Sequence, residues 1–533
     1  MSRLQICVES QFDDVPIRRI LVAITPYPMK HFPSLLALLP DAEVHGNAEI
    51  DIIDVTNDSR LVKPGWVFVA IAGTNVDSHD HVAAAVAAGA VLIVGQRPYT
   101  AVASELGAVP YVCVGDSRYA FAVLTHAVLD HPTRGLRVFG VTGTNGKTTC
   151  ATLLEQIFAA AGHNVGFIGT TGIRYGRTVL PSDYTTPHAR ALCDVIMTMK
   201  QAGVDTICME VSSHALDQHR VEGIRFQGAV FTNLTRDHLD YHGTMERYAD
   251  AKKKLFDMLD EDAVAVVFAD DAMAEHMVRD CRAGMIVRVG SAETADVVVN
   301  SVSLAATETA FTMTFADAPL GVRVTTPLVG QFNVTNASLC AVMAMHNGVS
   351  QTKMVDVLRH VRGPAGRMER YELANGAIAV IDYAHTPDAL AQALKALRDV
   401  VGSARLHVVF GCGGDRDAGK RPQMGRIAGD LADVVWLTSD NPRSEDPHAI
   451  IDAIRAGIRH ESCCIEQHVD RAEAIREALA DARPGDIVLI AGKGHETYQV
   501  VGSERYHFSD AEQVARFHAA AEGASVNHHG NHR

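Results

Sequence analysis

The sequence predicts an α/β protein of several domains, with parallel-rich sheets that carry helices on both faces. Three observations support this prediction: the length of 533 residues, a phosphate-loop motif around residue 147, and a regular strand–helix alternation in the last third of the chain. A chain of this length has room for roughly three or four domains. We expect domains at 1–135, 136–362 and 363–533, with the first boundary near the Asp130-His131-Pro132 break.

The phosphate-loop motif reads RVFGVTGTNGKTTC over residues 137–150. The apolar run Arg137–Val141 predicts a buried strand, and a helix with an apolar face is expected from Lys147 on. Backbone N–H groups and the positive helix end suit a phosphate, while Lys147 reaches the terminal phosphates and Thr148 holds Mg²⁺. Val141 stands where the general motif has glycine, so a plain glycine turn is the alternative. The predicted cradle comprises Gly143, Thr144, Asn145, Gly146, Lys147, Thr148 and Thr149.

Composition excludes several classes of protein. The formal net charge of −15 argues against a general nucleic-acid binder or a protein of anionic membrane surfaces. The N-terminus lacks the apolar core of a signal peptide, and the apolar-rich run 82–95 is too short to span a bilayer. Ten cysteines without zinc-type spacing favour reduced thiols. We therefore expect a cytoplasmic, monomeric protein that binds small molecules, without nucleic acid or membrane insertion.

Polar side chains follow the predicted strands of the second domain. Glu210 ends the strand expected over 205–211, and His238 follows the strand expected over 226–232. Ligands bind at the carboxyl ends of parallel strands, so both side chains are candidates for Mg²⁺ binding near Lys147. A salt-bridged acid and an ordinary loop histidine are the alternatives. The lysine run 252–254 fits a solvated helix face, and Asn336 fits a helix cap or a base contact.

The third domain shows the clearest alternation. Strands are expected at 378–381, 406–410, 434–438 and 487–491, and helices at 387–401, from 420, at 450–458 and at 471–480. This order predicts a doubly wound, Rossmann-like sheet whose strand ends carry four polar loops. The loops are 382–387, 411–421, 439–447 and 491–496. The polar tail 523–533 is expected to be disordered.

These loops together identify a family. The chain resembles the Mur ligases of bacterial peptidoglycan synthesis through GTNGKTT, TTPHA, MEVSSHAL, TNLTRDHLDYHG, AKKKLF, DYAHTP, GDRD, DNPR and GKGHE, between about residues 57 and 496. The resemblance implies an N-terminal UDP-substrate domain, a central ATPase domain and a C-terminal amino-acid domain. It also implies an ATP-dependent amide ligase that adds a third residue to UDP-N-acetylmuramoyl-L-alanyl-D-glutamate through an acyl phosphate.

The resemblance assigns residue roles by motif. ATP is the substrate held by the phosphate loop, completed by Asn336, Arg367 and Asp382. The muramoyl-dipeptide is assigned to Ser59, Thr185, Thr186, Ser212 and Arg220. Magnesium is assigned to Thr148, Glu210, His238 and Lys252, the last as a CO₂-derived carbamate, with Lys253 and Lys254 solvated. The catalytic group implied in this way is Lys147, Lys252, Glu210 and His238.

The third residue is assigned from the DNPR loop. In the family this motif resembles that of enzymes that add meso-2,6-diaminopimelate, whose far carboxylate suits the planar donor fork of Arg443. The remaining alternatives are a lysine-adding Mur ligase, a folylpolyglutamate-synthetase-like ligase, a nucleotide-switched regulator and a silent binding module. Residues 77–81 read DSHDH, where the family has glycine after the first Asp, which affects the uridine contacts. The implied diaminopimelate pocket comprises Arg416, Asp440, Asn441, Pro442, Arg443, Gly492 and Glu496.

Overall fold

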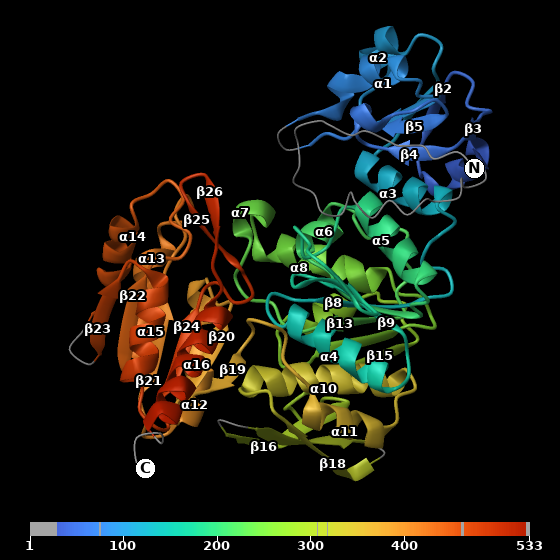
Figure 1. The fold of residues 1–533 in the computed structure, drawn as a ribbon. Helices are drawn as coiled ribbons and strands as arrows, with labels where there is room; N and C mark the ends of the chain where they lie inside the picture. The colour runs from blue at the N-terminus through green and yellow to red at the C-terminus, as the bar shows by residue number, and fades with distance from the viewer. Residues whose placement is uncertain (1–28, 74–75, 306–307, 317, 460–462, 529–533) are drawn as a thin grey trace. The chain divides into compact units, whose positions relative to one another are not determined.

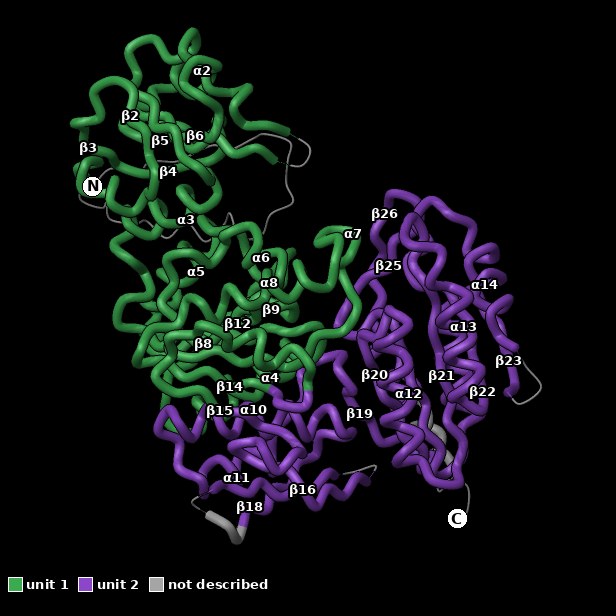
Figure 2. The backbone as a smooth tube through the Cα atoms, turned by 180° about the vertical axis from the view of Figure 1, so that it is seen from behind, with its two compact units in different colours: residues 1–267, 271–287 green, residues 268–270, 288–533 purple. Residues whose placement is uncertain are grey.

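The computed structural model describes residues 29–73, 76–305, 308–316, 318–459 and 463–528. The chain divides into two compact units, 1–267 with 271–287 and 268–270 with 288–533 (Figure 2). Both units contain parallel-rich sheets with helices (Figure 1), so the predicted α/β class is confirmed. The expected domain boundaries at 135/136 and 362/363 stay predictions.

The first part of unit 1 is built on a five-stranded sheet in the order β2-β7-β6-β5-β4. Strands β4 to β7 run parallel, and β2 pairs antiparallel with β7. After the last helix of this part, Asp130 and His131 take left-handed conformations, with φ of 60° and 52°, at the predicted break. The elements are β1 (Lys30–His31), η2 (Phe32–Leu38), β2 (Glu43–His45), β3 (Asp51–Ile52), β4 (Asp54–Thr56), η3 (Ser59–Leu61), β5 (Trp66–Val69), η4 (Ser78–His81), α1 (Val82–Ala87), β6 (Leu92–Gly95), α2 (Tyr99–Leu106), β7 (Tyr111–Cys113) and α3 (Ser117–Val128).

The second part of unit 1 carries the phosphate loop. Its strands follow the order β11-β10-β9-β12-β8-β13-β14, and those from β9 to β14 run parallel. Strand β15 spans the division between the units. The elements are β8 (Arg137–Thr142), α4 (Lys147–Ala160), β9 (Val165–Gly169), β10 (Gly172–Tyr175), β11 (Thr178–Leu180), α5 (Ala189–Gln201), β12 (Thr206–Glu210), α6 (Ser213–Asp217), β13 (Gly228–Phe231), α7 (Leu239–His242), α8 (Met245–Asp257), β14 (Val264–Phe268), α9 (Ala274–Val278) and β15 (Met285–Gly290).

Apolar packing fixes this sheet between two helix layers. Phe139 of β8 stacks on Phe158 of α4 with ring centroids 4.6 Å apart. On the opposite face, buried residues of α5 and α8, including Leu192 and Leu255, pack against Val138 and Ile207. Because β12, β8 and β13 are neighbours and parallel, the segments that follow them meet at one edge.

Unit 2 begins with three strands, β16, β17 and β18, which pair antiparallel with one another and are followed by two helices. It ends with a six-stranded sheet in the order β19-β20-β24-β21-β22-β23, parallel except for β19. The elements are β16 (Val297–Leu304), β17 (Thr309–Phe315), β18 (Ala318–Thr326), α10 (Gln331–His346), α11 (Gln351–His360), β19 (Glu369–Glu372), β20 (Ile378–Asp382), α12 (Pro387–Val401), β21 (Leu406–Phe410), α13 (Lys420–Leu431), β22 (Val434–Thr438), α14 (Pro447–Arg455), β23 (Cys464–His468), α15 (Arg471–Asp481), β24 (Ile487–Ala491), β25 (Tyr498–Val501), β26 (Glu504–His507) and α16 (Asp510–His528).

The six-stranded sheet is doubly wound, as predicted. Helices α12, α13 and α14 pack on one face, and α15 and α16 pack on the other. Helix α14 begins earlier than predicted, because Pro447 occupies its first turn and Asp446 caps it. The prediction of a disordered tail is wrong for residues 523–528, which continue α16 beyond its packed start, whereas 529–533 lie outside the described residues.

Within the part of the chain that the structure describes, no helix is both long enough and apolar enough to cross a membrane.

Candidate active site

The phosphate loop lies between β8 and α4 and is supported by the segment that follows β13. A Cβ atom at Gly143 would lie 1.9 Å from Thr232 Oγ1, so this position leaves no room for a side chain. The Thr232 hydroxyl donates to the Asn145 carbonyl at 2.5 Å. Asn233 accepts the amides of Thr144 (2.9 Å) and Asn145 (3.0 Å) through its carbonyl and side-chain oxygens. Thr232 and Asn233 therefore fix the conformation of the loop. We did not single out these two residues from the sequence, although they open the TNLT motif that follows a strand.

Lys147 and the start of α4 supply the positive side of this loop. Gly146 precedes the helix in a left-handed conformation, with φ of 86°. The Lys147 ammonium donates to the carbonyls of Gly143 and Thr144, both at 2.9 Å, and so lies over the loop. The first N–H groups of a helix have no intrahelical partner, and together with a lysine they suit an anion. Thr149 is buried in the first turn.

Glu210 lies at the end of β12, next to the start of α4, with only 1% of its surface exposed. Its carboxylate accepts the Thr148 hydroxyl at 2.9 Å and the Thr170 amide at 2.7 Å. A Cβ at Gly169 would lie 2.3 Å from Glu210 Oε1, so glycine is needed for this approach. Thr170 and Gly169 were not predicted, although Gly169 ends the strand β9 and Thr170 follows it directly. The result is a buried carboxylate and a hydroxyl side by side at the phosphate loop.

Lys252 of α8 is buried against the same loop, with 1% of its surface exposed. Its Nζ donates to the Gly143 carbonyl at 2.8 Å and lies 4.4 Å from the Tyr248 ring centroid. Burial, and to a lesser degree the charge of Lys147, hold the pKa of Lys252 well below its usual value, while Asp237 acts in the opposite direction. Burial therefore disfavours the ammonium form of Lys252 and favours its neutral amine.

The neighbouring lysines differ from the expectation that both are simply solvated. Lys253 pairs with Asp257 one turn on, and Lys254 lies 3.6 Å from Asp217. Both are only partly exposed, with side-chain exposures of 16% and 36%. Their ammonium groups are therefore engaged with carboxylates outside the phosphate loop.

His238 precedes α7 at its N-cap position and keeps much of its side chain exposed. Its ring centroid lies 4.8 Å from that of His214, in an edge-to-face arrangement. Burial lowers the pKa of His238, Asp237 raises it, and the charges of Lys147 and Lys252 lower it further. The lowered pKa favours the neutral imidazole, which is the form that can bind a metal. Among the described residues, no group of three or more His, Cys, Asp or Glu is already arranged around a metal position.

The residues predicted for the muramoyl-dipeptide lie beside Glu210, with one exception. The Thr186 hydroxyl donates to the Glu210 carbonyl at 2.9 Å and accepts the Ser212 amide at 3.1 Å. Arg220 donates to the Thr186 carbonyl at 3.0 Å. Thr185 contacts Thr170 at 3.0 Å between their hydroxyl oxygens. The exception is Ser59, which opens η3 in the first part of the unit and is half-buried.

The residues predicted to complete the nucleotide site lie in unit 2. Asn336 is buried in α10 and donates to Asn333 Oδ1 at 3.3 Å. Asp382 ends β20 and accepts the amides of Met368 (2.8 Å) and Ala384 (2.9 Å). Burial raises the pKa of Asp382, whereas the charge of Arg367 lowers it. Since the phosphate loop belongs to unit 1, convergence of the two groups stays a prediction.

A buried lysine organises the predicted amino-acid site of unit 2. Lys493 Nζ lies 3.3 Å from Asp440 Oδ1, 3.2 Å from Asn441 Oδ1 and 3.3 Å from Glu496 Oε2. Its side chain is fully buried. Burial raises the pKa of Glu496, and Lys493 lowers it. Lys493 was not predicted; its only sequence signal is its place between two glycines in GKGHE.

The DNPR loop lies across this cluster. Arg443 has a left-handed backbone, with φ of 51°, and donates from Nη1 to the Gly414 carbonyl at 2.7 Å. A Cβ at Gly492 would lie 2.9 Å from Asp440 Oδ2. The structure therefore brings together six predicted residues, Asp440, Asn441, Pro442, Arg443, Gly492 and Glu496. The seventh, Arg416, is exposed on the adjoining loop and donates to the Asp415 carbonyl at 3.3 Å.

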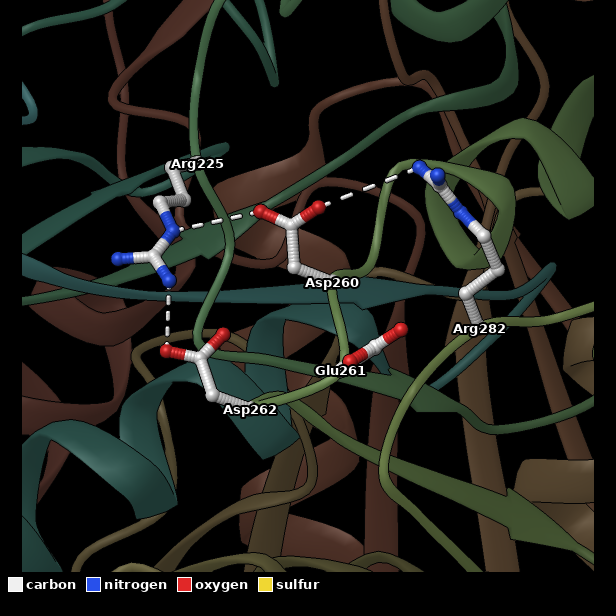
Figure 3. Close-up of a pocket in the computed structure, with 5 residues that line it drawn as sticks. All are labelled: Arg225, Asp260, Glu261, Asp262 and Arg282. Atoms are coloured by element: carbon white, nitrogen blue, oxygen red, sulfur yellow. Dashed lines mark hydrogen bonds and ion pairs between the residues drawn. The ribbon is translucent and has the colours of Figure 1, made fainter.

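A charged hollow of about 390 Å³ lies elsewhere on unit 1, lined by Arg225, Asp260, Glu261, Asp262 and Arg282 (Figure 3). Arg225 donates to Asp262 at 2.6 Å and to Asp260 at 3.3 Å. Arg225 precedes β13 and Asp260–Asp262 precede β14, so they lie at the amino ends of parallel strands, and Arg282 precedes β15. Ligands of such sheets bind at the carboxyl ends, and we do not assign this hollow to the reaction.

Comparison with known proteins agrees with this geometry. Three family descriptions match: "Mur ligase family, catalytic domain" over residues 51–118, "Mur ligase middle domain" over 141–344, and "Mur ligase, glutamate ligase domain" over 366–494.

Similar proteins match nearly the whole chain. The UDP-N-acetylmuramoyl-L-alanyl-D-glutamate--2,6-diaminopimelate ligase of Geobacillus kaustophilus is 43% identical over 90% of this chain and 97% of its own. The protein of that name from Chlorobaculum tepidum is 42% identical, over 90% and 94%. A solved structure titled with the same enzyme name has a TM-score of 0.69 and 33% identity, and it covers 93% of this chain and 100% of that one.

Proposed function

Because the chain belongs to the Mur ligase family, whose members are ATP-dependent ligases, we propose that it joins meso-2,6-diaminopimelate to the D-glutamate of UDP-N-acetylmuramoyl-L-alanyl-D-glutamate. The observation that carries this proposal is the buried Lys252 amine, 2.8 Å from the Gly143 carbonyl of the phosphate loop. A plain nucleotide switch has no need of a buried lysine there. The substrates in this proposal are taken from the names of the relatives that this chain matches over most of their length.

The chemistry begins with an unreactive acid. The D-glutamyl carboxylate repels an incoming amine, so the γ-phosphate of ATP is transferred to it, giving ADP and an acyl phosphate. The amine of diaminopimelate, after losing a proton, attacks the acyl carbon. The tetrahedral intermediate then expels phosphate and leaves an amide. Positioning and charge neutralisation supply most of the catalysis in such phosphoryl transfers.

The residues of unit 1 divide these tasks. The Lys147 ammonium lies over the loop and offsets charge on the terminal phosphates. The N–H groups at the start of α4 hold the phosphate oxygens. Thr185, Thr186, Ser212 and Arg220 lie next to Glu210, where they orient the peptide acid toward the phosphate.

The residues at the loop also fit magnesium. Thr148 and Glu210 offer oxygen donors 2.9 Å apart, the type of ligand that Mg²⁺ prefers. In its neutral form His238 adds a nitrogen donor. When bound, Mg²⁺ offsets the negative charge of phosphate and carboxylate.

Lys252 completes this set as a carbamate. Only a neutral amine attacks CO₂, and burial favours that form of Lys252 by lowering its pKa. The Nζ–carbon bond forms, a proton leaves, and the buried neutral amine becomes an anion able to hold metal. This explains why a lysine occupies a fully buried position beside Gly143.

The amino-acid site in unit 2 fits diaminopimelate. Asp440 and Glu496 suit its ammonium end, and Arg443 with Arg416 suits the far carboxylate. Two carboxyl groups, Asp440 and Glu496, lie 3.3 Å from the single Lys493 ammonium, so the site has an acidic group to offer to an ammonium of the substrate. Lysine lacks the far carboxylate, which disfavours the lysine-adding alternative. We also expect ATP supply to place the reaction in the cytoplasm, and the enzyme to act as a monomer.

A ligation assay tests the proposal. Purified protein, ATP, Mg²⁺ and UDP-muramoyl-dipeptide should yield the tripeptide with diaminopimelate and little product with lysine, measured by mass spectrometry and phosphate release. Lys147→Ala should abolish the product. Preference for lysine, or product formation independent of ATP, would refute the assignment.

A further inference from the structure

The C-terminal sheet contains a fully buried ion pair outside the predicted amino-acid site. Arg471, at the start of α15, donates to Asp510 from Nε at 2.8 Å and from Nη2 at 2.7 Å. Both side chains have no exposed surface. The same Nη2 also donates to the Ala491 carbonyl at 3.0 Å. One guanidinium therefore joins the end of β24 to the start of α16.

These two anchor points enclose the segment that builds the site. Residues 492–509 leave the sheet after Ala491, form the β25–β26 hairpin and return at Asp510. The segment supplies Gly492, Lys493 and Glu496. Arg471 therefore holds the two ends of this segment together.

The enclosed segment is tied to the DNPR loop on its other side. The Val500 amide donates to Asn441 Oδ1 at 2.9 Å, and Gln499 donates to the Asp440 carbonyl at 2.6 Å. The Arg443 amide donates to the Val500 carbonyl at 3.1 Å. A displacement of the two ends of the segment is thus transmitted to Asp440, Asn441 and Arg443.

We propose that Arg471 and Asp510 form a clamp that positions the diaminopimelate site, which rests on the function proposed above. Fixing both ends of a segment limits the conformations that it samples. Burial lowers the pKa of Arg471, but the charges of Asp510, Asp440 and Glu496 raise it, so the clamp also interacts electrostatically with the site. Buried ion pairs stabilise proteins little compared with apolar residues of similar volume, so a positioning role accounts better for this one.

A control residue lies at the other end of the same strand, before β24 begins. Asp486 is also buried and accepts Arg405 Nε at 3.0 Å, but it precedes β24 instead of following it. Asp486→Asn therefore disrupts another ion pair of the same sheet, whose arginine is 31% exposed, without touching residues 492–509.

The test compares Asp510→Asn and Arg471→Lys with Asp486→Asn in the full-length enzyme. Both clamp variants should lower kcat/KM for diaminopimelate about tenfold to a hundredfold, mainly through KM, with the KM for ATP nearly unchanged. Amide hydrogen exchange should accelerate in residues 492–509 only in the clamp variants. Asp510→Glu keeps a carboxylate, so its KM for diaminopimelate should lie between those of the wild-type enzyme and Asp510→Asn.

Three outcomes would overturn the proposal: an unchanged KM for diaminopimelate in both clamp variants, equal effects of the control variant, or loss of the whole folding transition in the clamp variants. The last outcome would show that the pair supports the entire sheet. If the wild-type enzyme joins no diaminopimelate, the proposed function fails, while hydrogen exchange still tests the clamp separately.

Discussion

Replacing Gly143 by alanine should disable the phosphate loop for a steric reason that the structure quantifies. The new methyl carbon would lie 1.9 Å from Thr232 Oγ1, with Asn233 backbone atoms at 3.1 and 3.2 Å. Optimal heavy-atom separations are about 3.5 Å or more, so the loop or the threonine must move by roughly 1.5 Å. Thr232 cannot move freely, because its hydroxyl donates to the Asn145 carbonyl.

This displacement predicts a catalytic loss rather than a general loss of folding. A misplacement of 1 Å can cost about a hundredfold in rate, so we expect kcat/KM for ATP to fall by about that factor. The assay is ATP-dependent ligation at saturating peptide and amino acid, with thermal unfolding measured alongside. Gly162→Ala is the control, because Gly162 follows the same helix at φ +97° with no atom within 4 Å of the added methyl.

A second substitution makes the steric explanation refutable. Thr232→Ala removes the closest atom, so Gly143→Ala/Thr232→Ala should recover part of the activity lost in Gly143→Ala alone. The remaining neighbours, at 3.1 and 3.2 Å, need only small adjustments. Full activity of Gly143→Ala, or a double variant that is simply the product of the two single effects, would contradict this reasoning.

Three further predictions concern other parts of the chain. Lys252→Ala should be inactive and partly rescued by short carboxylic acids; full activity without them would exclude the carbamate. Arg443→Lys should raise the KM for diaminopimelate far more than that for ATP, since a single ammonium cannot replace the planar fork; equal changes would argue against the pocket. Burial lowers the pKa of His126 to about 4, so the unfolded chain binds more protons below pH 6.5 and stability falls with pH down to about 4. His126→Leu should remove up to ~3 kcal/mol of this dependence in urea unfolding at pH 7 and pH 4.5, and an unchanged difference would contradict it.

The elements that the sequence predicts well are those with buried, apolar strands. Strands β21, β22 and β24 and helix α12 have the expected bounds, since an apolar run bounded by polar loops has few other interpretations. Strand β23 was not predicted, because it pairs only with β22 at the edge and its residues, CIEQH, are largely exposed and polar. Edge strands lack the apolar signal of central ones.

The residues that support the site were harder to predict than the residues in its motifs. Thr170, Thr232 and Lys493 matter because of the groups that they contact, such as Glu210, the Asn145 carbonyl and Asp440, and these lie far away in sequence. Thr170 meets Glu210 only because β9 and β12 are neighbours in the sheet, an order that the sequence does not state. The phosphate loop can be predicted without knowing the strand order, because its strand, turn and helix are contiguous in sequence.

Lys252 lies far from the phosphate loop in sequence, yet its burial can be predicted from the helical periodicity of its own helix. The buried residues of α8 include Tyr248, Leu255 and Phe256, so Lys252 lies one turn from Tyr248 and one turn from Phe256 on the same face. Lys253 and Lys254 fall outside that face and pair with carboxylates. Lysine is almost never fully buried without a partner charge, so a lysine on an apolar helix stripe indicates chemistry rather than solubility. The apolar pattern of α8 therefore selects the same lysine as the family motif, through an independent physical argument.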